Sequence, residues 1–222
     1  MLDKIVIKAP AKINLFLNIL DKRNDGYHNI RSGITFINLF DEVFIKKSNA
    51  MSIKYYGNFK PQEGIYKNCI INKTLKFLKL DNKINLEIKI KKNIPVQSGL
   101  GSASANAAAL IKGLEKLQII EKNFNYNNFS FLGTDVPVCL YGKNSIIEGI
   151  GDIISEQVFP NYYFLLVMPS VTLSTKYMYN KIRDHRKKNP NKFFIDNKNN
   201  DFEKILRLEY DEIDKLLTFL SN

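Results

Sequence analysis

Cysteine is scarce in this chain of 222 residues, since only Cys69 and Cys139 are present and each lies in an apolar stretch. Disulfide frameworks and zinc sites need several cysteines or histidines at short, regular spacings, and no such spacing occurs here. We therefore expect both thiols to be reduced side chains of the core, in a protein of a reducing compartment.

Long apolar runs are also missing. The longest candidate is the run at 162–168 (YYFLLVM), far below the roughly 20 residues that a membrane-spanning helix needs. The N-terminal residues show strand-like alternation, without the apolar segment of a signal peptide or the pattern of a transit peptide. We therefore expect a cytoplasmic protein with no membrane partner, in which residues 162–168 form a buried strand.

Basic residues outnumber acidic ones by 33 to 22, which gives a net charge of +11. Such a surplus is compatible with nucleic-acid binding, which would be steeply salt-dependent, and this is our non-enzyme alternative. The lysines alternate with apolar residues, however, as at 84–92 (INLEIKIKK), and do not form one patch. We therefore favour scattered, solvated charge with no nucleic-acid partner, although a positive field would help to attract a polyphosphate.

The order of predicted elements indicates an α+β fold with most strands first, in two segments that meet near residue 150. Alternating apolar residues predict strands over 4–8, 13–20, 34–46, 51–56, 84–90 and 162–168. Helical spacing predicts helices over 68–80 (capped by Asn68), 102–117, 127–132, 174–181 and 210–220. The basic, asparagine-rich stretch 183–200 is predicted to be a solvated connection.

A glycine-rich loop (PVQSGLGSASAN) occupies residues 95–106, between a predicted strand and a predicted helix. Gly99 and Gly101 allow a tight turn and a close approach to a ligand, and free N–H groups at a helix start favour phosphates. Ser102 and Ser104 add hydroxyl donors. The loop lacks the lysine of a Walker motif and the third glycine of a dinucleotide-binding motif. Local sequence alone leaves an ordinary strand-to-helix turn equally open.

Three motifs in order resemble one family of the GHMP kinase superfamily. The loop is similar to the ATP motif Pro-x-x-x-Gly-Leu-Gly-Ser-Ser-x-Ala, with Ala103 in place of a serine. Residues 10–15 (PAKINL) with 23–28 (RNDGYH), and residues 133–137 (GTDVP), resemble motifs of the diphosphocytidyl-methylerythritol kinases. The resemblance implies a ribosomal-protein-S5-type α/β domain over 1–150 and a partial ferredoxin-like domain over 151–222.

The resemblance also implies an activity. It is the ATP-dependent phosphorylation of the 2-hydroxyl of a cytidine-diphosphate-linked methylerythritol, in the non-mevalonate route to isoprenoid precursors. Mg²⁺ would shield the triphosphate, with Ser104 as a possible contributor, because no acidic cluster identifies a metal site. The alternatives are a GHMP kinase for homoserine or mevalonate and an inactive remnant of the fold. We expect a monomer or a homodimer.

Two residues are expected to be catalytic. Asp135, on a turn between apolar segments, can take the proton from the substrate hydroxyl, although a turn or helix-capping aspartate would look the same locally. Lys12 lies among apolar neighbours, where an ammonium needs an anionic partner, and Asp135 or the transferring phosphoryl group would serve. An outward-facing strand lysine is the alternative for Lys12.

The resemblance assigns the binding residues. Stacking of the cytosine on an aromatic ring is physically reasonable for Tyr27 and His28, which follow a turn. The substrate-binding set is Asn14, Tyr27, His28 and Thr175. The ATP-binding set is Pro95, Val96, Gln97, Ser98, Gly99, Leu100, Gly101, Ser102, Ala103, Ser104 and Ala105.

The chain departs from the family pattern near its C-terminus. The family has a further Gly-Thr-Gly motif and more strands after the helix that corresponds to 210–220, whereas this sequence ends at Asn222. We expect an incomplete second domain with an unpaired strand edge and exposed apolar surface. Such a chain would be weakly active or inactive, or a partner chain would supply the rest.

Overall fold

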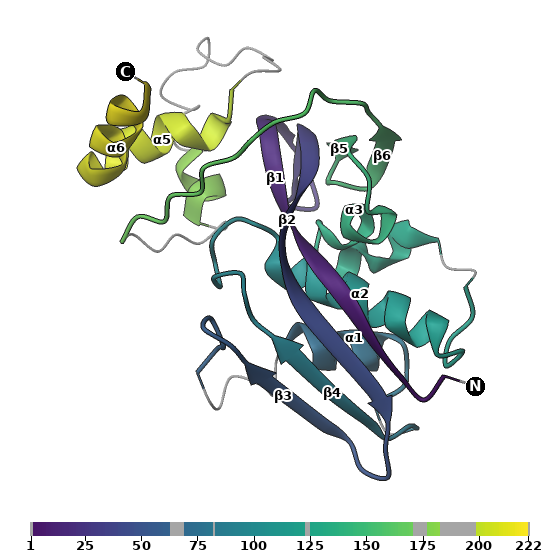
Figure 1. The fold of residues 1–222 in the computed structure, drawn as a ribbon. Coiled ribbons are helices and arrows are strands. Elements are labelled where there is room, and N and C mark those ends of the chain that lie inside the picture. Colours follow the sequence, from purple (N-terminus) through teal and green to yellow (C-terminus); the bar gives the residue numbers. More distant parts are fainter. Residues whose placement is uncertain are drawn as a thin grey trace.

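The computed structural model describes residues 2–62, 69–81, 83–122, 125–170, 177–182 and 199–221. Its described strands form one six-stranded sheet in the order β3-β4-β2-β5-β6, with β1 also paired to β2 (Figure 1). The pairs are antiparallel except for β3 and β4, which are parallel. The strands are β1 (Lys4–Lys22), β2 (His28–Lys47), β3 (Ser52–Tyr56), β4 (Leu86–Lys91), β5 (Ser145–Gly149) and β6 (Ile153–Glu156).

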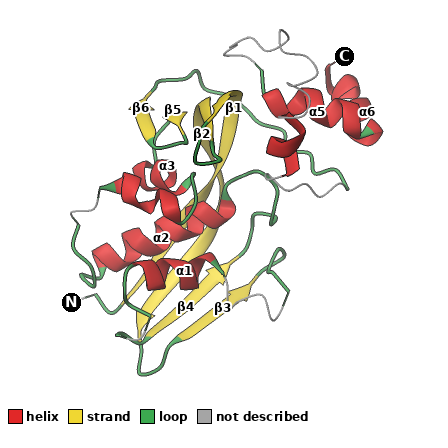
Figure 2. Ribbon diagram, turned by 180° about the vertical axis from the view of Figure 1, so that it is seen from behind, coloured by secondary structure: helices red, strands yellow, loops and turns green. Residues whose placement is uncertain are grey.

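Helices cover one face of this sheet and gather again at the far end of the long β1–β2 ribbon. Helices α1, α2 and α3 lie on the covered face, whereas α5 and α6 lie beyond the ribbon end (Figure 2). Residues 177–182 are helical as well. The helices are α1 (Ile70–Phe77), α2 (Ser102–Lys116), the 3-10 helix η2 (Tyr126–Phe131), α3 (Val136–Tyr141), α5 (Asp201–Glu209) and α6 (Asp211–Ser221).

The main core lies between the sheet and α2, and it follows from two sequence patterns. In β4 the alternating Leu86, Ile88 and Ile90 are fully buried, as a strand with one covered face requires. Helix α2 carries a run of buried small and apolar residues from Ala105 to Leu114, so it can pack closely on the sheet. These elements confirm the predicted strands of the first half, the helix at 102–117 and the α+β class.

The β1–β2 ribbon is irregular at one place that matters for the site. Pro10 pairs with Phe40 and Lys12 with Phe36, so β2 advances by more residues than β1 between these pairs. Such a bulge bends and twists the ribbon and frees backbone groups from the ladder. The backbone N–H of Lys12 instead donates to the carbonyl of Leu100, at 3.0 Å.

A second apolar cluster ties the C-terminal helices to the ribbon. It joins Leu17 and Ile19 of β1 to Met178 and Ile182 and to Ile205 of α5. The Asn200 side chain accepts from the N–H of Phe202 and caps α5, and a buried Asp201 carboxylate oxygen accepts from the N–H of Ile19 at 2.8 Å. Helix α5 was not predicted, whereas α6 matches the helix predicted over 210–220.

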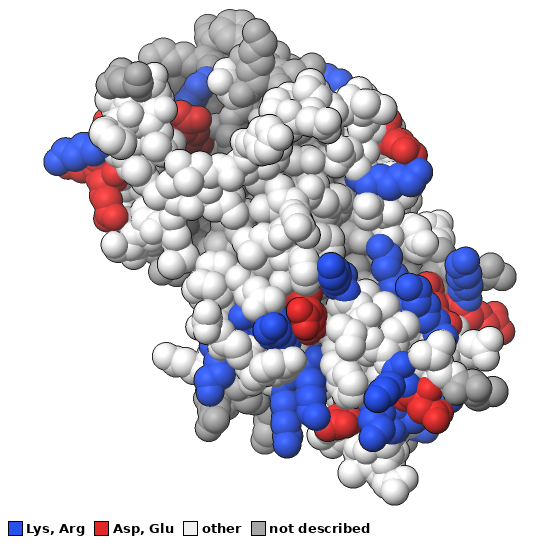
Figure 3. Space-filling view, viewed as in Figure 1, with Lys and Arg blue, Asp and Glu red and all other residues white. Residues whose placement is uncertain are grey.

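The prediction of a buried strand at 162–168 is wrong. These residues form no strand; Tyr163 is 103% exposed and Leu165 is 80% exposed. A strand needs a partner for its backbone, and within the described chain the backbone of 159–169 makes no hydrogen bond. The segment crosses the upper part of Figure 1, where the middle of the face in Figure 3 is uncharged and Lys, Arg, Asp and Glu side chains lie at its margins. The exposed apolar surface expected of an incomplete second domain is present at this segment, but its unpaired residues do not keep strand geometry.

Several expectations concern local details. Helix α1 begins after Cys69, and its proposed cap Asn68 lies outside the described residues, as do 174–176 and most of the stretch 183–200. Both cysteines are free thiols, and Cys139 is buried. Lys and Arg side chains in Figure 3 lie mainly over the lower half of the face and are mixed with acidic ones. No helix of the described residues is long and apolar enough to cross a membrane.

Candidate active site

The loop before α2 has the backbone geometry of a ligand-binding turn. Gln97, Gly99 and Gly101 have positive φ angles of 58°, 74° and 68°, so the chain reverses its curvature repeatedly before the helix begins. Gly101 is the N-cap residue of α2 and supplies no side-chain cap. The first N–H groups of a 15-residue helix are therefore left for another acceptor, and their positive end suits an anion.

Gly101 also brings the loop into contact with Lys12. A Cβ atom at position 101 would lie 2.7 Å from Cγ of Lys12, too close for any side chain. Glycine is required here by its φ angle and by this contact, because the Lys12 stem lies directly against the loop backbone. The ammonium of Lys12 is thus held beside the start of α2.

Lys12 and Asp135 form the central ion pair of the site. Their Nζ and Oδ2 atoms are 3.3 Å apart, with the Lys12 side chain 9% exposed and that of Asp135 29% exposed. Lys12 Nζ also donates to Oδ1 of Asn14 at 2.6 Å, and Asn14 Nδ2 donates to Ser32 at 2.7 Å. Lys12 therefore points inward and is not an outward-facing strand lysine.

Asp135 stands at the N-cap position of α3, where its local alternative role would be to cap that helix. Its side chain makes no capping hydrogen bond. The carboxylate is instead turned to Lys12 while part of it stays open to solvent. This arrangement leaves an oxygen free to accept a proton from a bound hydroxyl, as general-base catalysis requires.

Two close contacts hold the segment that carries Asp135. The hydroxyl oxygen of Ser104 lies 3.3 Å from the place of a Cβ at Gly133, so the first turn of α2 touches this segment. On the other side, a Cβ at Gly151 would lie 2.9 Å from the carbonyl of Thr134. The segment is therefore fixed between α2 and the β5–β6 turn, and Ser104 lies next to the site.

An aromatic group adjoins the ion pair. The rings of His28 and Tyr179 stack with centroids 5.2 Å apart and planes 15° apart, and Phe202 meets Tyr179 edge-on. Burial raises the pKa of Tyr179 to about 12, and the negative charge of Asp135 adds to this rise. Tyr179 is therefore a neutral phenol close enough to Asp135 to interact with its charge. Tyr27, which precedes His28 in the chain, is 52% exposed.

The candidate residues thus divide by position. Lys12, Asn14, Asp135 and the loop converge, and His28 stacks beside them with Tyr179, which the sequence did not single out. Thr175 lies outside the described residues. No local signal marks Tyr179, since an aromatic residue on a short helix is usually a packing residue.

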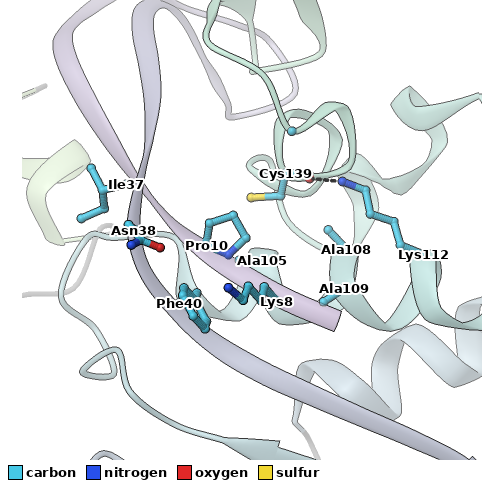
Figure 4. Close-up of a pocket in the computed structure, with 11 residues that line it drawn as sticks. Lys8, Pro10, Ile37, Asn38, Phe40, Ala105, Ala108, Ala109, Lys112 and Cys139 are labelled. Carbon is cyan, nitrogen blue, oxygen red and sulfur yellow. Dashed lines mark hydrogen bonds between the residues drawn. The ribbon is translucent and has the colours of Figure 1, made fainter. Parts of the chain in front are cut away.

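Cys139 lies one helical turn after Asp135 but is chemically inert. Burial raises the pKa of its thiol to about 12, and the nearby Asp135 carboxylate adds to the effect. A pocket of about 300 Å³ lies beside Cys139, and neither Lys12 nor Asp135 lines it (Figure 4). In this pocket Lys112 Nζ donates to the carbonyl of Cys139 at 3.0 Å and Lys8 lies over the ring of Phe40. Within the described ranges, no three acidic, His or Cys side chains gather as metal ligands would.

Comparisons with known proteins show similarity to kinases in sequence and in fold. The model of the GHMP kinases N terminal domain matches residues 68–153. A 4-diphosphocytidyl-2-C-methyl-D-erythritol kinase of Francisella philomiragia is 36% identical over 212 residues, covering 91% of this chain and 76% of that protein. The protein of the same name from Fervidobacterium nodosum is 38% identical, over 81% of this chain and 66% of its own.

A solved structure shares the fold. The crystal structure of 4-(cytidine 5'-diphospho)-2C-methyl-D-erythritol kinase matches with a TM-score of 0.73 and 21% identity, over 96% of this chain and 81% of that chain. The likeness extends beyond the sheet and α2, because nearly the whole chain is covered.

Proposed function

Because this chain belongs to the 4-diphosphocytidyl-2-C-methyl-D-erythritol kinase family of the GHMP kinases, we propose that it phosphorylates the alcohol for which these kinases are named. The reaction is the transfer of the γ-phosphoryl group of ATP to the 2-hydroxyl of 4-diphosphocytidyl-2-C-methyl-D-erythritol, in isoprenoid precursor biosynthesis. The domain division at residue 150 and the choice between monomer and homodimer stay part of this proposal.

One observation carries the proposal: the ion pair of Lys12 and Asp135, 3.3 Å apart, lies against an uncapped helix start. Phosphoryl transfer needs bound phosphates, a neutralising charge and an acceptor for the hydroxyl proton, all in one place. The loop at 95–105 would bind the phosphates, and Lys12 would stabilise the transferring group. Asp135 would accept the proton of the substrate hydroxyl as the oxygen of that hydroxyl attacks the γ-phosphorus of ATP and ADP leaves.

The alcohol would bind on the side of the aromatic group. A pyrimidine base has two π-faces, so an exposed Tyr27 and the stacked rings of His28 and Tyr179 suit it. Asn14 has its oxygen on Lys12 and its amide on Ser32, and in our proposal it orients Lys12 as well as the substrate. Thr175 remains a proposed substrate contact by family likeness alone.

Mg²⁺ fits this site only as a partner of the nucleotide. The described residues offer no acidic cluster, and the Asp135 carboxylate already faces Lys12. Mg²⁺ commonly keeps several waters and binds substrate phosphates with one or two protein ligands, and Ser104 is the side chain placed to contribute. When bound, the ion would neutralise charge on the β- and γ-phosphates.

A substrate panel tests the proposal. The chain is incubated with ATP and Mg²⁺ and with 4-diphosphocytidyl-2-C-methyl-D-erythritol, homoserine or mevalonate, and ADP release is recorded. We expect release only with the cytidylyl alcohol. Equal rates with homoserine or mevalonate would contradict the substrate assignment, and ATP binding without transfer to any of the three would indicate an inactive member of the family.

The Lys12→Met variant tests the ion pair. Loss of the ammonium removes a charge that acts on the transferring group, so we expect kcat to fall by about 100-fold or more. Lys143→Met is the matched control, since Lys143 pairs with Glu156 at an exposed site. Equal activity of the two variants would refute the role given to Lys12.

A further inference from the structure

A buried polar cluster lies at the root of the loop, and two of its three members have no part in the chemistry described so far. Asp41 on β2 is 0% exposed and Lys92, directly after β4, is 3% exposed, and the two form an ion pair. Ser102, the first residue of α2, is 9% exposed and joins them. Its hydroxyl donates to Asp41 Oδ2 at 2.8 Å and accepts from Lys92 Nζ.

The other oxygen of Asp41 binds the chain before the loop. Its Oδ1 accepts from the N–H of Asn93 at 2.7 Å and from the N–H of Ile94 at 2.9 Å. The Asn93 amide adds a bond to the carbonyl of Phe40 at 2.8 Å. One carboxylate therefore holds both ends of the loop, residues 93–94 on the entering side and Ser102 on the leaving side.

Burying these charged side chains costs free energy, and their hydrogen bonds therefore indicate what the cluster is for. A buried ion pair alone seldom adds stability, because the desolvation of two charges offsets their attraction. Burial lowers the pKa of Lys92, although its hydrogen bond and charge attraction with Asp41 oppose that fall. Every side-chain hydrogen bond of the cluster is directed at the loop ends or at its own members, which points to a role in fixing the loop.

We propose that Asp41, Lys92 and Ser102 are positioning residues for the phosphate loop. Asp41 clamps the loop at both ends, and the Ser102 hydroxyl is engaged within the protein, so it does not donate to a phosphate. The loop N–H groups are thereby arranged before the nucleotide arrives, which reduces the ordering cost of binding. This inference rests on the proposed function in that the loop binds ATP.

The first test is ATP affinity in Ser102→Ala, measured by calorimetry. We expect the dissociation constant for ATP to rise about tenfold, because a lost hydrogen bond to a charged cluster loosens the loop. The KM for the cytidylyl alcohol should stay unchanged. Thr74→Ala is the control, since it removes a fully buried hydroxyl that bonds to Ile70 on α1, away from the loop. A purely structural role would lower the thermal stability of both variants and leave both ATP affinities unchanged, which would overturn the proposal.

A double-mutant cycle with Asp41→Asn separates positioning from direct contact. Asp41 is fully buried, so it can affect ATP only through the residues that it holds. If Ser102 acts through Asp41, adding Ser102→Ala to Asp41→Asn should weaken ATP binding little further. Independent, multiplying effects would show that Ser102 contacts the phosphate directly, against the proposal.

A third test measures amide hydrogen exchange in the absence of nucleotide. It requires neither kinase activity nor a folded Asp41→Asn variant. The N–H groups of Asn93 and Ile94, both held by Asp41, should exchange faster in Ser102→Ala than in the unaltered chain and in Thr74→Ala. Unchanged exchange overturns the inference even if the chain is a kinase. Faster exchange in a chain that binds no ATP would leave the loop clamp standing and reject the proposed function.

Discussion

Strand β4 and the segment 162–168 are both rich in apolar residues, yet only β4 is a strand. The former pairs with β2 and β3 and buries Leu86, Ile88 and Ile90 completely. The latter has no backbone partner among the described residues, and Leu165 is 80% exposed. Apolar composition therefore produces a strand only where neighbouring strands take up its N–H and C=O groups. The proposed catalytic residues, Lys12 and Asp135, belong to the part of the chain formed by the paired strands and the helices that cover them, and not to the segment 162–168.

The largest effect is expected from the partnered strand. Ile88→Ala leaves a cavity between the sheet and the helices, so the free energy of unfolding should fall by about 2–5 kcal/mol. Urea unfolding followed by circular dichroism measures it. A loss no greater than that of an exposed residue would mean that β4 is not part of the core described here.

The next effect concerns the loop that this core supports. Gly101→Ala combines an unfavourable φ of 68° with a contact 2.7 Å from Lys12, so it should displace the ammonium and lower kcat/KM about 100-fold. Gly99→Ala is the matched control, since its φ is 74° but nothing lies within 4 Å of its Cβ. Steady-state kinetics measures both variants. Equal losses of kcat/KM would show that the contact between position 101 and Lys12 does not matter for activity.

A smaller effect should separate two aromatic residues, one from each region. Tyr179→Ala removes a ring that stacks on His28, and we expect the KM for the cytidylyl alcohol to rise about tenfold with the KM for ATP unchanged. Tyr163→Ala removes a fully exposed ring from the extended segment and should change neither constant. If ATP affinity falls in Tyr179→Ala, the aromatic group does not belong to the alcohol.

The smallest effect is expected at Leu165. Because this side chain is already 80% exposed, Leu165→Ala should change the free energy of unfolding by less than about 0.5 kcal/mol. The same urea titration as for Ile88→Ala gives the number. A loss of stability comparable to that of a core residue would show that the segment 162–168 is covered in solution and does not differ from β4 in burial.

Local patterns predicted the elements that local forces determine. The alternation of β4, the small-residue run of α2 and the glycines of the loop are all legible in short windows. Helix α5 could also have been found, because Asn200 and Asp201 with Glu203 form an N-terminal capping pattern. The prediction of a strand at 162–168 is wrong because a short stretch of sequence does not show whether another strand lies beside it in the fold.

The site was predictable only in part, because its contacts join distant residues. The pairing of Lys12 with Asp135 came from family likeness, and the intervening residues contain no signal that would join the two. The sequence does not predict the cluster of Asp41, Lys92 and Ser102 for the same reason, since Asp41 and Lys92 look like ordinary strand charges. Tyr179 likewise becomes meaningful only when His28 lies against it.

The most direct test of the central claim is to measure ATP binding and phosphoryl transfer together in Asp135→Asn. The substitution keeps the size of the side chain and removes the base, so the account predicts ATP affinity within about twofold of the unaltered chain and transfer reduced by 100-fold or more, about the range of general-base catalysis. Asp214→Asn on α6, where Asp214 pairs with Arg207, is the control and should behave as the unaltered chain. Transfer at an undiminished rate in Asp135→Asn would contradict the account.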